Sequence, residues 1–397
     1  MRVLMLSWEY PPHLVGGLGK HVTEIIPALV RQGVRIDLLT PRWAGGEHWE
    51  VVAGATIHRV DPGASNGDIY TTAWQTNVTL ERYVEQLWSK SGGFDLIHAH
   101  DWLVAFSANA LKRRYRVPLL ATIHATEKGR GRGNLNNDIS HAIHSAEWWL
   151  TYEAWRVIAC SAFMAQEIIN YFNVPPDKVD VVPNGVDVAP FQQYDGMDLT
   201  GFRTMYALPE EQIVFNVGRI VAEKGVQVLV EAVPRVLAAQ PQAKFVIAGR
   251  GDMVDELRRR AWELGVGQKI LFCGYISDED RNRLYRVAHC AVFPSLYEPF
   301  GIVALEAMAA RCPVVVSDVG GLREVVRHGE TGITTYAGNP DSLAWGILHT
   351  LQHPEWTAQR VQKAARVVAE EYNWDRIAQQ TVAIYQRILR ERAETAW

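Results

Sequence analysis

The chain has 397 residues, which is enough for about two domains. Its 48% hydrophobic and 21% charged residues are typical of a globular protein and exclude a disordered or fibrous chain. The net charge is −4, so the chain lacks the broad positive field that non-specific binding of nucleic acid requires. We therefore expect no nucleic-acid partner.

Membrane and disulfide signals are also missing from the sequence. No apolar stretch approaches the ~18 residues of a membrane-spanning helix, and the apolar run at the start is too short for the core of a signal peptide. The four cysteines are scattered and form no CxxC pair, which is typical of a reducing compartment without disulfides or a zinc cluster. We expect a cytoplasmic protein with no integral membrane segment.

Strand and helix patterns alternate in the first half of the chain. Near-continuous apolar strands separated by amphipathic helices indicate a parallel sheet that is covered on both faces. The predicted strands are 3–7, 34–39, 96–99, 118–123 and 157–159, and the predicted helices are 20–31 and 103–114.

The alternation restarts after residue 212, which predicts a second sheet of the same kind. Its predicted strands are 213–217, 244–248, 270–273, 291–293 and 313–317, and its helices are 225–238, 253–264 and 278–287. The segment 182–200 between the two series contains Pro, Asn and Gly and is interpreted as a hinge. A long amphipathic helix over 374–390 follows the second series. These patterns predict an α/β fold of two doubly wound, Rossmann-like domains that face each other across a cleft.

Ligands of such folds bind beyond the carboxyl ends of the strands, so the loops that follow strands are searched first. The first strand is followed by a glycine-rich turn, Gly16-Gly17-Leu18-Gly19, that opens a helix. Glycine lets backbone N–H groups approach an anion, and a helix N-terminus favours negative charge. The turn is no Walker P-loop, because His21 stands where Ser or Thr is needed. A tight turn without a ligand is the alternative.

Two cations follow the first strand of the second series. Arg219 and Lys224 each lie beside a glycine close to the end of that strand. An arginine can bind two oxygens at once and a lysine acts as a point charge, so the pair suits a diphosphate. The alternative is a solvated loop with a local Lys–Glu pair.

Two glutamates surround the end of a later strand. Glu298 lies in the loop after residue 293, and Glu306 lies in the second turn of a helix that starts near Gly301. Glu306 sits among apolar residues, where an unpaired carboxylate is costly, so it needs hydrogen-bond donors such as sugar hydroxyls. A core Glu paired with Arg is the alternative. Two carboxylates also suit a glycosidase, which has no need of the phosphate-binding features.

Histidines mark the strand ends of the first domain. His124 ends the strand 118–123 and could donate a hydrogen bond to a sugar hydroxyl or a leaving group, although a structural role is the alternative. His98 and His100 lie on one side of a strand, but no third ligand for a metal ion is apparent. We therefore predict no metal site.

Taken in this order, these segments resemble the GT4-like family of retaining nucleotide-sugar glycosyltransferases, which have the GT-B fold and include glycogen synthases and sucrose synthases. The resemblance covers nearly the whole chain and is most specific at Glu298 and Glu306 with Pro299-Phe300-Gly301 between them. It extends to Gly218-Arg219, to Glu223-Lys224-Gly225, to the early Gly16-Gly17-Leu18-Gly19 loop and to Pro183-Asn184-Gly185-Val186-Asp187.

The resemblance implies a role for each matching residue. Arg219 and Lys224 would bind the donor diphosphate, Glu306 the ribose, Glu298 the transferred sugar, and His124 the sugar near its reacting carbon. The implied catalytic residues are His124, Arg219, Lys224 and Glu298, and the implied donor-binding residues are Gly16, Gly17, Arg219, Lys224, Phe300, Gly301, Ile302, Val303 and Glu306. Tyr275 and Ile276 could line the donor base.

The same resemblance implies the domain layout and the reaction. Residues 1–185 would form the acceptor-side domain, 186–373 the nucleotide-sugar-binding domain, and 374–397 a helix that crosses back to the first domain. The implied reaction is metal-independent transfer of a hexosyl group, here glucosyl, from UDP- or ADP-glucose to a sugar, a sugar phosphate or an α-glucan, with no cofactor. The alternatives are mannosyl, GlcNAc, maltosyl-phosphate or sucrose-type synthesis, an epimerase on the same fold, or a non-catalytic regulator that binds the nucleotide sugar.

Overall fold

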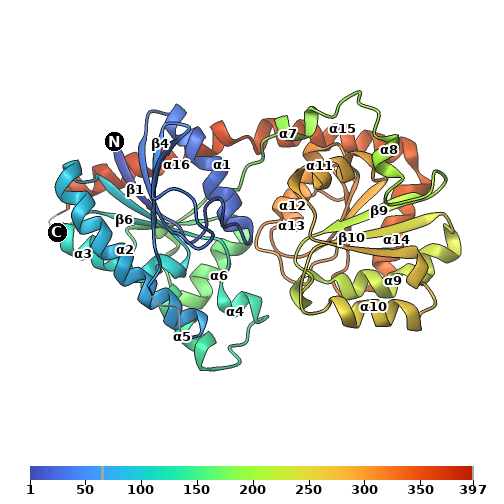
Figure 1. The fold of residues 1–397 in the computed structure, drawn as a ribbon, viewed down its shortest axis with the longest axis horizontal. Helices are drawn as coiled ribbons and strands as arrows, with labels where there is room; N and C mark the ends of the chain where they lie inside the picture. Colours follow the sequence, from blue (N-terminus) through green and yellow to red (C-terminus); the bar gives the residue numbers. More distant parts are fainter. Residues whose placement is uncertain (64–66, 396–397) are drawn as a thin grey trace. The chain divides into compact units, whose positions relative to one another are not determined.

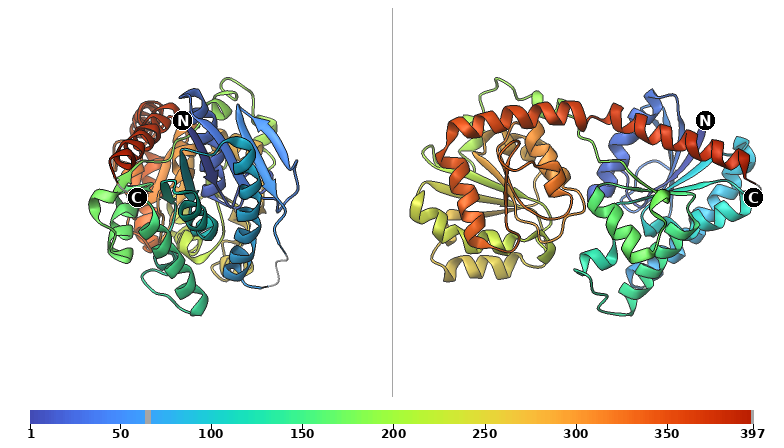
Figure 2. Two further views of the ribbon diagram at one scale, coloured as in Figure 1. Left: turned by 90° about the vertical axis from the view of Figure 1, so that its left-hand side faces the viewer. Right: turned by 180° about the vertical axis from the view of Figure 1, so that it is seen from behind.

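The computed structural model describes residues 1–63 and 67–395. Their contacts divide the chain into two compact units, of which unit 1 is formed by residues 1–185 together with 374–397, and unit 2 by residues 186–373 (Figure 1). Each unit is a largely parallel sheet with helices on both faces (Figures 1 and 2). The predicted Rossmann-like α/β fold is therefore confirmed for both units.

Unit 1 contains an eight-stranded sheet in the order β3-β4-β2-β1-β5-β6-β7-β8. All neighbouring strands are parallel except β3 and β4, which form an antiparallel hairpin at the sheet edge. The strand order reverses between β1 and β5, so this is the point where a ligand crevice is expected. The strands are β1 Arg2–Leu6, β2 Arg35–Pro41, β3 Trp49–Val52, β4 Ala55–Val60, β5 Leu96–His100, β6 Leu119–Ile123, β7 Arg156–Ala159 and β8 Val179–Val181.

Helices cover this sheet on both sides. Each long helix buries one apolar face. In several helices a side chain accepts a backbone N–H of the first turn, as Asp68 does for α2 and Ser161 does for α6. The helices of unit 1 are α1 Gly17–Arg31, α2 Ile69–Ser91, α3 Ala105–Tyr115, α4 Glu127–Arg130, α5 Asp138–Glu153, α6 Ala162–Phe172 and α16 Trp374–Glu394, with 3-10 turns η1 Trp102–Val104 and η2 Pro176–Lys178.

The last helix of the chain, α16, belongs to the core of unit 1. Its side chains Ile377, Tyr385 and Ile388 are fully buried in the cluster that also contains the apolar faces of β1 and α1. Polar contacts support this packing: the Trp374 indole donates to Glu24 Oε2 at 2.7 Å. The N-terminal fold is thus completed by residues that follow unit 2 in the sequence.

Unit 2 contains a six-stranded, entirely parallel sheet in the order β11-β10-β9-β12-β13-β14. Counted within the unit, this is the 3-2-1-4-5-6 order of the dinucleotide-binding folds, with its reversal between β9 and β12. The strands are β9 Gln212–Val217, β10 Ala243–Ala248, β11 Ile270–Gly274, β12 Cys290–Phe293, β13 Val314–Ser317 and β14 Ile333–Thr335.

The helices of unit 2 pack their apolar faces against this sheet around a core that includes Phe245, Val292 and Ile347. They are α7 Ala189–Gln192, α8 Thr200–Arg203, α9 Val226–Ala239, α10 Val254–Glu263, α11 Asp278–Val287, α12 Ile302–Ala309, α13 Leu322–Val325, α14 Pro340–Gln352 and α15 Pro354–Glu371, with 3-10 turns η3 Ala222–Lys224 and η4 Gly267–Lys269. Within the described residues, every helix of the chain is too short or too polar to span a lipid bilayer.

Each predicted strand and helix corresponds to an element of the structure, with differences at the first or last residues. Several elements were not predicted: the hairpin β3–β4, the helices α2, α5, α6, α14 and α15, and the short strands β8 and β14. The hairpin strand β3 is largely exposed, so its residues lack the apolar run that marks the buried strands. The segment predicted as a hinge contains an irregular stretch followed by the short helix α7, and the Val186 N–H donates to the Tyr372 carbonyl at 2.9 Å.

Candidate active site

Unit 2 brings its predicted site residues to the point where the strand order reverses. Arg219 and Lys224 follow β9, while Glu298 and Gly301 follow the neighbouring strand β12. The two strands are joined at this end by the Asn216 side chain, which donates to the Val292 carbonyl at 2.7 Å. The parallel topology therefore gathers residues that are some 80 positions apart in the sequence, at the edge where such sheets bind ligands.

The two cations both have carboxylate partners. Arg219 is half exposed and donates to Glu223 Oε1 at 3.0 Å, whereas Lys224 donates to Glu298 Oε2 at 2.7 Å. The alternative named a local Lys–Glu pair, but the local pair in the structure is formed by Arg219 and Glu223. Lys224 pairs instead with the other predicted site residue, so cation and carboxylate are held together at the strand edge.

Close packing of the backbone positions this pair. Gly225, after Lys224, has a φ of +70°, and a Cβ there would lie 1.9 Å from the Pro294 carbonyl oxygen. The N–H of Leu296 donates to the Glu223 carbonyl at 2.8 Å, and the N–H of Gly321 donates to the Glu298 carbonyl at 2.9 Å. Only glycine allows so close an approach of the two loops, which explains the glycine beside Lys224.

The helix α12 begins at Ile302, next to Gly301, as predicted. Its N-cap Gly301 has a φ of +106°, and a Cβ there would lie 2.5 Å from Leu322 Cδ2. The first helical residues Ile302 and Val303 are half-buried and carry backbone N–H groups that have no partner within the helix. Phe300 is buried and packs edge-on against Tyr372, 6.1 Å between ring centroids, so its side chain belongs to the core of the unit.

Glu306 is buried in the second turn of α12 and has polar neighbours from α11. The Tyr285 hydroxyl donates to Glu306 Oε2 at 3.3 Å, and Arg281 Nε lies 3.7 Å from the same oxygen. Burial raises the pKa of the Tyr285 hydroxyl, so it stays protonated as a donor. The arginine of the alternative interpretation is therefore present, together with a tyrosine hydroxyl that was not predicted, while the contact with sugar hydroxyls stays a prediction.

In unit 1 the glycine-rich turn closes around an internal carboxylate. Gly16 is the N-cap of α1, and Glu9 Oε2 accepts the N–H of Val15 at 2.9 Å and of Gly16 at 3.0 Å. A Cβ on Gly19 would lie 2.7 Å from this carboxylate, so that glycine is required for packing. The turn does bind an anion through backbone N–H groups, but at Gly16 that anion is the side chain of Glu9.

His124, after β6, joins three other imidazoles. Its Nε2 lies 3.1 Å from His100 Nδ1, and its ring meets that of His21 edge-on at 4.8 Å between centroids. His98 has other partners: its Nε2 lies 2.7 Å from Thr122 Oγ1, and its Nδ1 lies 2.7 Å from the Tyr385 hydroxyl of α16. Burial lowers the pKa values of all four, to about 4 for His21 and about 3 for His98, so the rings are neutral at neutral pH.

This arrangement changes the set of residues that could hold a metal ion. The ligand atoms of His21, His100 and His124 all lie within 4.8 Å of one another, so His21 supplies the third ligand that the sequence did not reveal. Two of these nitrogens already form the His100–His124 hydrogen bond, and His21 Nδ1 is 2.7 Å from Asn184 Oδ1. The three rings are thus held together by ring contacts, while the hydrogen bonds join His100 to His124 and His21 to Asn184.

Asp101 is a residue that the sequence did not single out as functional. It follows β5, is buried, and has a φ of 60°, which is strained for a residue with a side chain. Its Oδ1 accepts the His124 N–H at 2.6 Å, so it fixes the backbone that carries this histidine. Burial raises the pKa of the Asp101 carboxyl to about 7. In the sequence, the position of Asp101 directly after the strand that contains His98 and His100 could have indicated that it belongs to the site.

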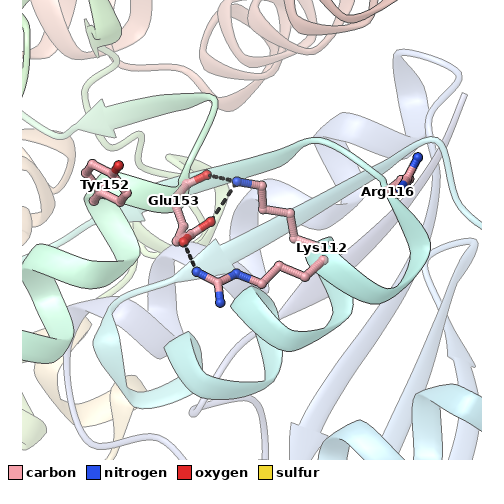
Figure 3. A pocket seen from close by; sticks show the side chains of 5 residues that line it. Lys112, Arg116, Tyr152 and Glu153 are labelled. Atoms are coloured by element: carbon pink, nitrogen blue, oxygen red, sulfur yellow. Dashed lines mark hydrogen bonds and ion pairs between the residues drawn. The ribbon is translucent and has the colours of Figure 1, made fainter. Parts of the chain in front are cut away.

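A cavity of about 730 Å³ lies elsewhere in unit 1, among Lys112, Arg113, Arg116, Tyr152 and Glu153 (Figure 3). Lys112 donates to the Glu153 carbonyl at 2.7 Å and to its carboxylate at 2.8 Å, and Arg113 pairs with the same carboxylate (Figure 3). These cations serve the last turn of α5, where cations stabilise a helix end. Because α5 ends just before β7 begins, the cavity lies at the opposite sheet edge from His124.

Comparison with known proteins assigns the family. The family model for Glycosyltransferase Family 4 matches residues 15–190, and that for Glycosyl transferases group 1 matches residues 204–368. A glycosyltransferase of Methanocaldococcus jannaschii is 40% identical over 97% of this chain and 98% of its own length. The chain is a GT4-like glycosyltransferase.

Two further proteins resemble this glycosyltransferase along its length. The glycogen synthase of Mycobacterium tuberculosis is 35% identical over 97% of the chain and 94% of its own length. The solved structure of sucrose-phosphate synthase from Thermosynechococcus elongatus has a TM-score of 0.81 at 24% identity, covering 98% of this chain and 99% of that one. The fold of the glycosyltransferase is therefore GT-B, as the sequence predicted.

Proposed function

We propose that this glycosyltransferase transfers a glucosyl group from a nucleotide-diphosphate sugar to a hydroxyl of an α-glucan, a sugar or a sugar phosphate, with retention of the anomeric configuration and without a metal ion. The observation that carries the proposal is the juxtaposition of Lys224 with Glu298 after β9 and β12. A cation for a leaving diphosphate and a carboxylate for sugar hydroxyls meet there at the ligand-binding edge of a nucleotide-binding sheet. The similarity to a glycogen synthase supports the glucosyl group and the glucan acceptor.

The proposed roles follow from charge and position. Arg219, Lys224 and the N–H groups at the start of α12 stabilise the negative charge that develops on the departing diphosphate. Glu306 accepts hydrogen bonds from the ribose, and the Tyr285 hydroxyl beside it holds the carboxylate in place. We assign His124, whose imidazole is neutral, to the transferred sugar, and Gly17 to the donor phosphate, as the family resemblance implies.

The proposed chemistry is a displacement on one face of the sugar. The bond from the anomeric carbon to the diphosphate oxygen breaks, and the bond to the acceptor oxygen forms on the same side. The acceptor hydroxyl gives its proton to the departing phosphate, which leaves as the nucleoside diphosphate. The fixed cations lower the barrier because they are complementary to charge that grows only in the transition state.

A donor screen tests this proposal. Purified protein is incubated with UDP-, ADP- and GDP-sugars, with and without an oligoglucan, and nucleotide release is measured in the presence of EDTA. We expect acceptor-dependent release with a glucose donor, and NMR of the product should show an α-glucosidic bond. Binding of a donor without release for any acceptor would support the non-catalytic regulator instead.

Substitution of Glu306 tests the ribose role separately. Glu306→Gln keeps the shape of the side chain but removes its charge, so we expect donor affinity to fall by about tenfold, the loss of roughly one charge-assisted hydrogen bond. Calorimetry of nucleotide binding measures it, with Glu330→Gln, an exposed residue of the same unit, as the control. Unchanged donor affinity in Glu306→Gln would remove the residue from the donor site.

A further inference from the structure

Five aromatic and imidazole rings form a continuous strip on the surface of unit 2. The strip consists of His328, Trp345, His349, His353 and Trp356. Successive rings are close: the centroid distance is 6.4 Å from His328 to Trp345, 5.3 Å from Trp345 to His349, and 5.8 Å from His349 to Trp356. The two indoles keep 49% and 55% of their surface exposed. Large rings that stay half exposed side by side are typical of a binding surface.

Neighbouring rings of the strip are either stacked or tilted. The interplanar angle is 20° between His328 and Trp345, 16° between Trp345 and His349, and 6° between His353 and Trp356, whose centroids are 5.0 Å apart, so these pairs are stacked. His349 is tilted by 37° from His353 and by 39° from Trp356. Half-exposed flat rings in a row suit a ligand made of successive flat, weakly polar units. The pyranose rings of a polysaccharide are of this kind, because each presents a face of C–H groups.

The backbone under the strip is firmly held. Gly346 of α14 packs so closely on the sheet that a Cβ would lie 2.6 Å from Thr335 Cγ2. The Thr357 hydroxyl donates to the Thr350 carbonyl at 2.9 Å and ties α15 to α14. A surface that is already ordered loses little conformational entropy when a ligand binds.

Hydrogen bonds also fix two of the imidazoles. His328 Nδ1 accepts the N–H of Thr334 at 3.1 Å, so the proton of the neutral ring is on Nε2, where it can serve a ligand hydroxyl. His353 Nδ1 lies 3.0 Å from the His349 carbonyl and donates to it, which leaves Nε2 as an acceptor in the neutral ring. The strip therefore offers both donors and acceptors at the edges of its apolar faces, as the hydroxyl groups around a sugar ring require.

The strip is distinct from the candidate active site. Arg219, Lys224 and Glu298 follow the carboxyl ends of β9 and β12. Helix α14 starts beyond the carboxyl end of β14 and runs back along the sheet, so His349 and Trp356 lie towards the opposite edge, where His328 precedes β14. A chain bound to the strip is thus held by the protein without being at the reacting atoms.

We propose that the strip of His328, Trp345, His349, His353 and Trp356 binds an α-glucan chain, by stacking of pyranose rings on the two indoles. The proposal rests on the proposed function in so far as the glucan is taken to be the acceptor. A polymer held at the strip keeps its chain ends near the enzyme, which raises their effective concentration at the active site. A neutral polysaccharide suits this surface better than a nucleic acid, because the arginines beside the strip are not free to contact phosphates: Arg327 is paired with Glu371, and Arg360 is buried.

Removal of the indoles tests the proposal. The variant Trp345→Ala/Trp356→Ala loses both stacking faces, and Trp262→Ala removes an indole of α10 that is 64% exposed and lies outside the strip. Binding to glycogen and to maltoheptaose is measured by affinity electrophoresis and calorimetry without a donor. We expect about a tenfold loss of affinity in the double variant, which corresponds to about 1.4 kcal/mol for the two stacked rings together, and no loss in Trp262→Ala.

Kinetics separate this role from the catalytic one. In the double variant we expect the KM for glycogen to rise about tenfold, while kcat and the KM for maltotriose stay unchanged, because a short acceptor cannot reach both surfaces. Trp345→Tyr/Trp356→Tyr restores two aromatic faces and should recover most of the affinity. This rescue, with an unchanged circular dichroism spectrum, distinguishes lost stacking from lost folding.

The outcomes for the two proposals are distinguishable. Glycogen binding that the double variant loses supports the strip even if the wild type transfers no glucosyl group, in which case only the proposed function fails. Wild-type glycogen affinity in the double variant overturns the strip, even if transfer is observed. Concentration-dependent self-association that the double variant abolishes, with no glucan binding by the wild type, would also overturn it and identify the strip as an interface between copies of the chain.

Discussion

At the scale of single residues, the candidate site is a set of charges that neutralise one another. Lys224 and Glu298 are 2.7 Å apart, and the carboxylate is buried. A buried carboxylate needs a partner, and the ion pair with Lys224 supplies one and holds the Glu298 side chain in position. The same lysine is the proposed ligand of the diphosphate, and a bound donor would then share it with Glu298.

Substitution of these cations should reduce turnover strongly. Lys224→Ala or Arg219→Ala removes a preorganised positive charge from the departing diphosphate, and we expect kcat to fall by roughly 10²–10³. Nucleotide release measures the effect. Lys244→Ala, on β10 and hydrogen-bonded to the Gln268 carbonyl at 2.7 Å, is the matched control and should keep the wild-type rate. A wild-type rate in either site variant would exclude that cation from the mechanism.

The imidazoles of unit 1 give a pH prediction. His21, His98, His100 and His124 have pKa values lowered by burial, so the native state stays unprotonated where the unfolded chain takes up protons below pH 6.5. Each of these histidines therefore lowers the free energy of unfolding as the pH falls from about 6.5 towards its pKa in the native state. Asp101 acts in the opposite direction between about pH 4 and 7, because its raised pKa lets the native state hold the extra proton.

NMR titration of the imidazole signals checks this prediction. We expect the four rings to show no protonation between pH 7.5 and 5.5, and all of them to titrate near 6.5 once the chain is unfolded in urea. A native-state transition near 6.5 for His98, which contacts Thr122 and Tyr385, would show that water reaches the cluster. That result would contradict the buried, neutral arrangement described above.

At the scale of elements, the position of α16 matters most. The helix follows unit 2 in the sequence but buries its apolar face in unit 1, against α1 and the strands below it. It also contacts the histidines, since the Tyr385 hydroxyl is 2.7 Å from His98 Nδ1 and the Trp374 ring meets His21 edge-on at 5.4 Å between centroids. The element therefore links the packing of unit 1 to the imidazoles around His124.

A cavity created where this helix packs against the core should destabilise unit 1 selectively. Ile377→Ala removes a fully buried side chain of α16, and we expect a loss of about 2–5 kcal/mol in the free energy of unfolding. Hydrogen exchange should show faster exchange in β1, α1 and β5 and unchanged exchange in β9 to β12. Gln379→Ala, on the exposed face of the same helix, serves as the control. Faster exchange in unit 2 alone would contradict this placement of α16.

At the scale of the whole molecule, the two units differ in how the chain builds them. Unit 2 is continuous from residue 186 to 373, whereas unit 1 is assembled from residues 1–185 and 374–397. Unit 1 consequently cannot complete its core until the residues of α16 have been made. The chain crosses between the units twice, after Gly185 and after Asn373.

Separate expression of the segments tests this organisation. Residues 186–373 should fold alone into a cooperative unit, because their core is contributed entirely from within that range. Residues 1–185 alone should form a loosely packed state, since the surfaces covered by Ile377, Tyr385 and Ile388 are left exposed. Adding a peptide of residues 374–395 should restore cooperative unfolding. A cooperative transition for 1–185 without the peptide would refute the requirement for α16.

Patterns local in the sequence determined much of this protein. The near-continuous apolar strands, which are buried on both faces, predicted both parallel sheets, and the strand-to-helix turns at Gly16 and Gly301 marked the edges where ligands bind. The pair Glu298 and Glu306 needed no tertiary information, because both lie within one strand–loop–helix segment. The exposed strand β3 and the more polar helix α2 escaped prediction, since their residues lack a buried apolar run.

Only the tertiary structure decided which distant residues meet. Lys224 pairs with Glu298 because β9 lies beside β12. The Gly16 N–H donates to Glu9 because of the way the turn closes. His21 lies beside His100 and His124 because α1 packs on the sheet. The strip from His328 to Trp356 likewise exists only once α14 and α15 are packed side by side. Local periodicity specifies the elements, whereas strand order and packing specify their neighbours, and no residue pattern within one element encodes that order.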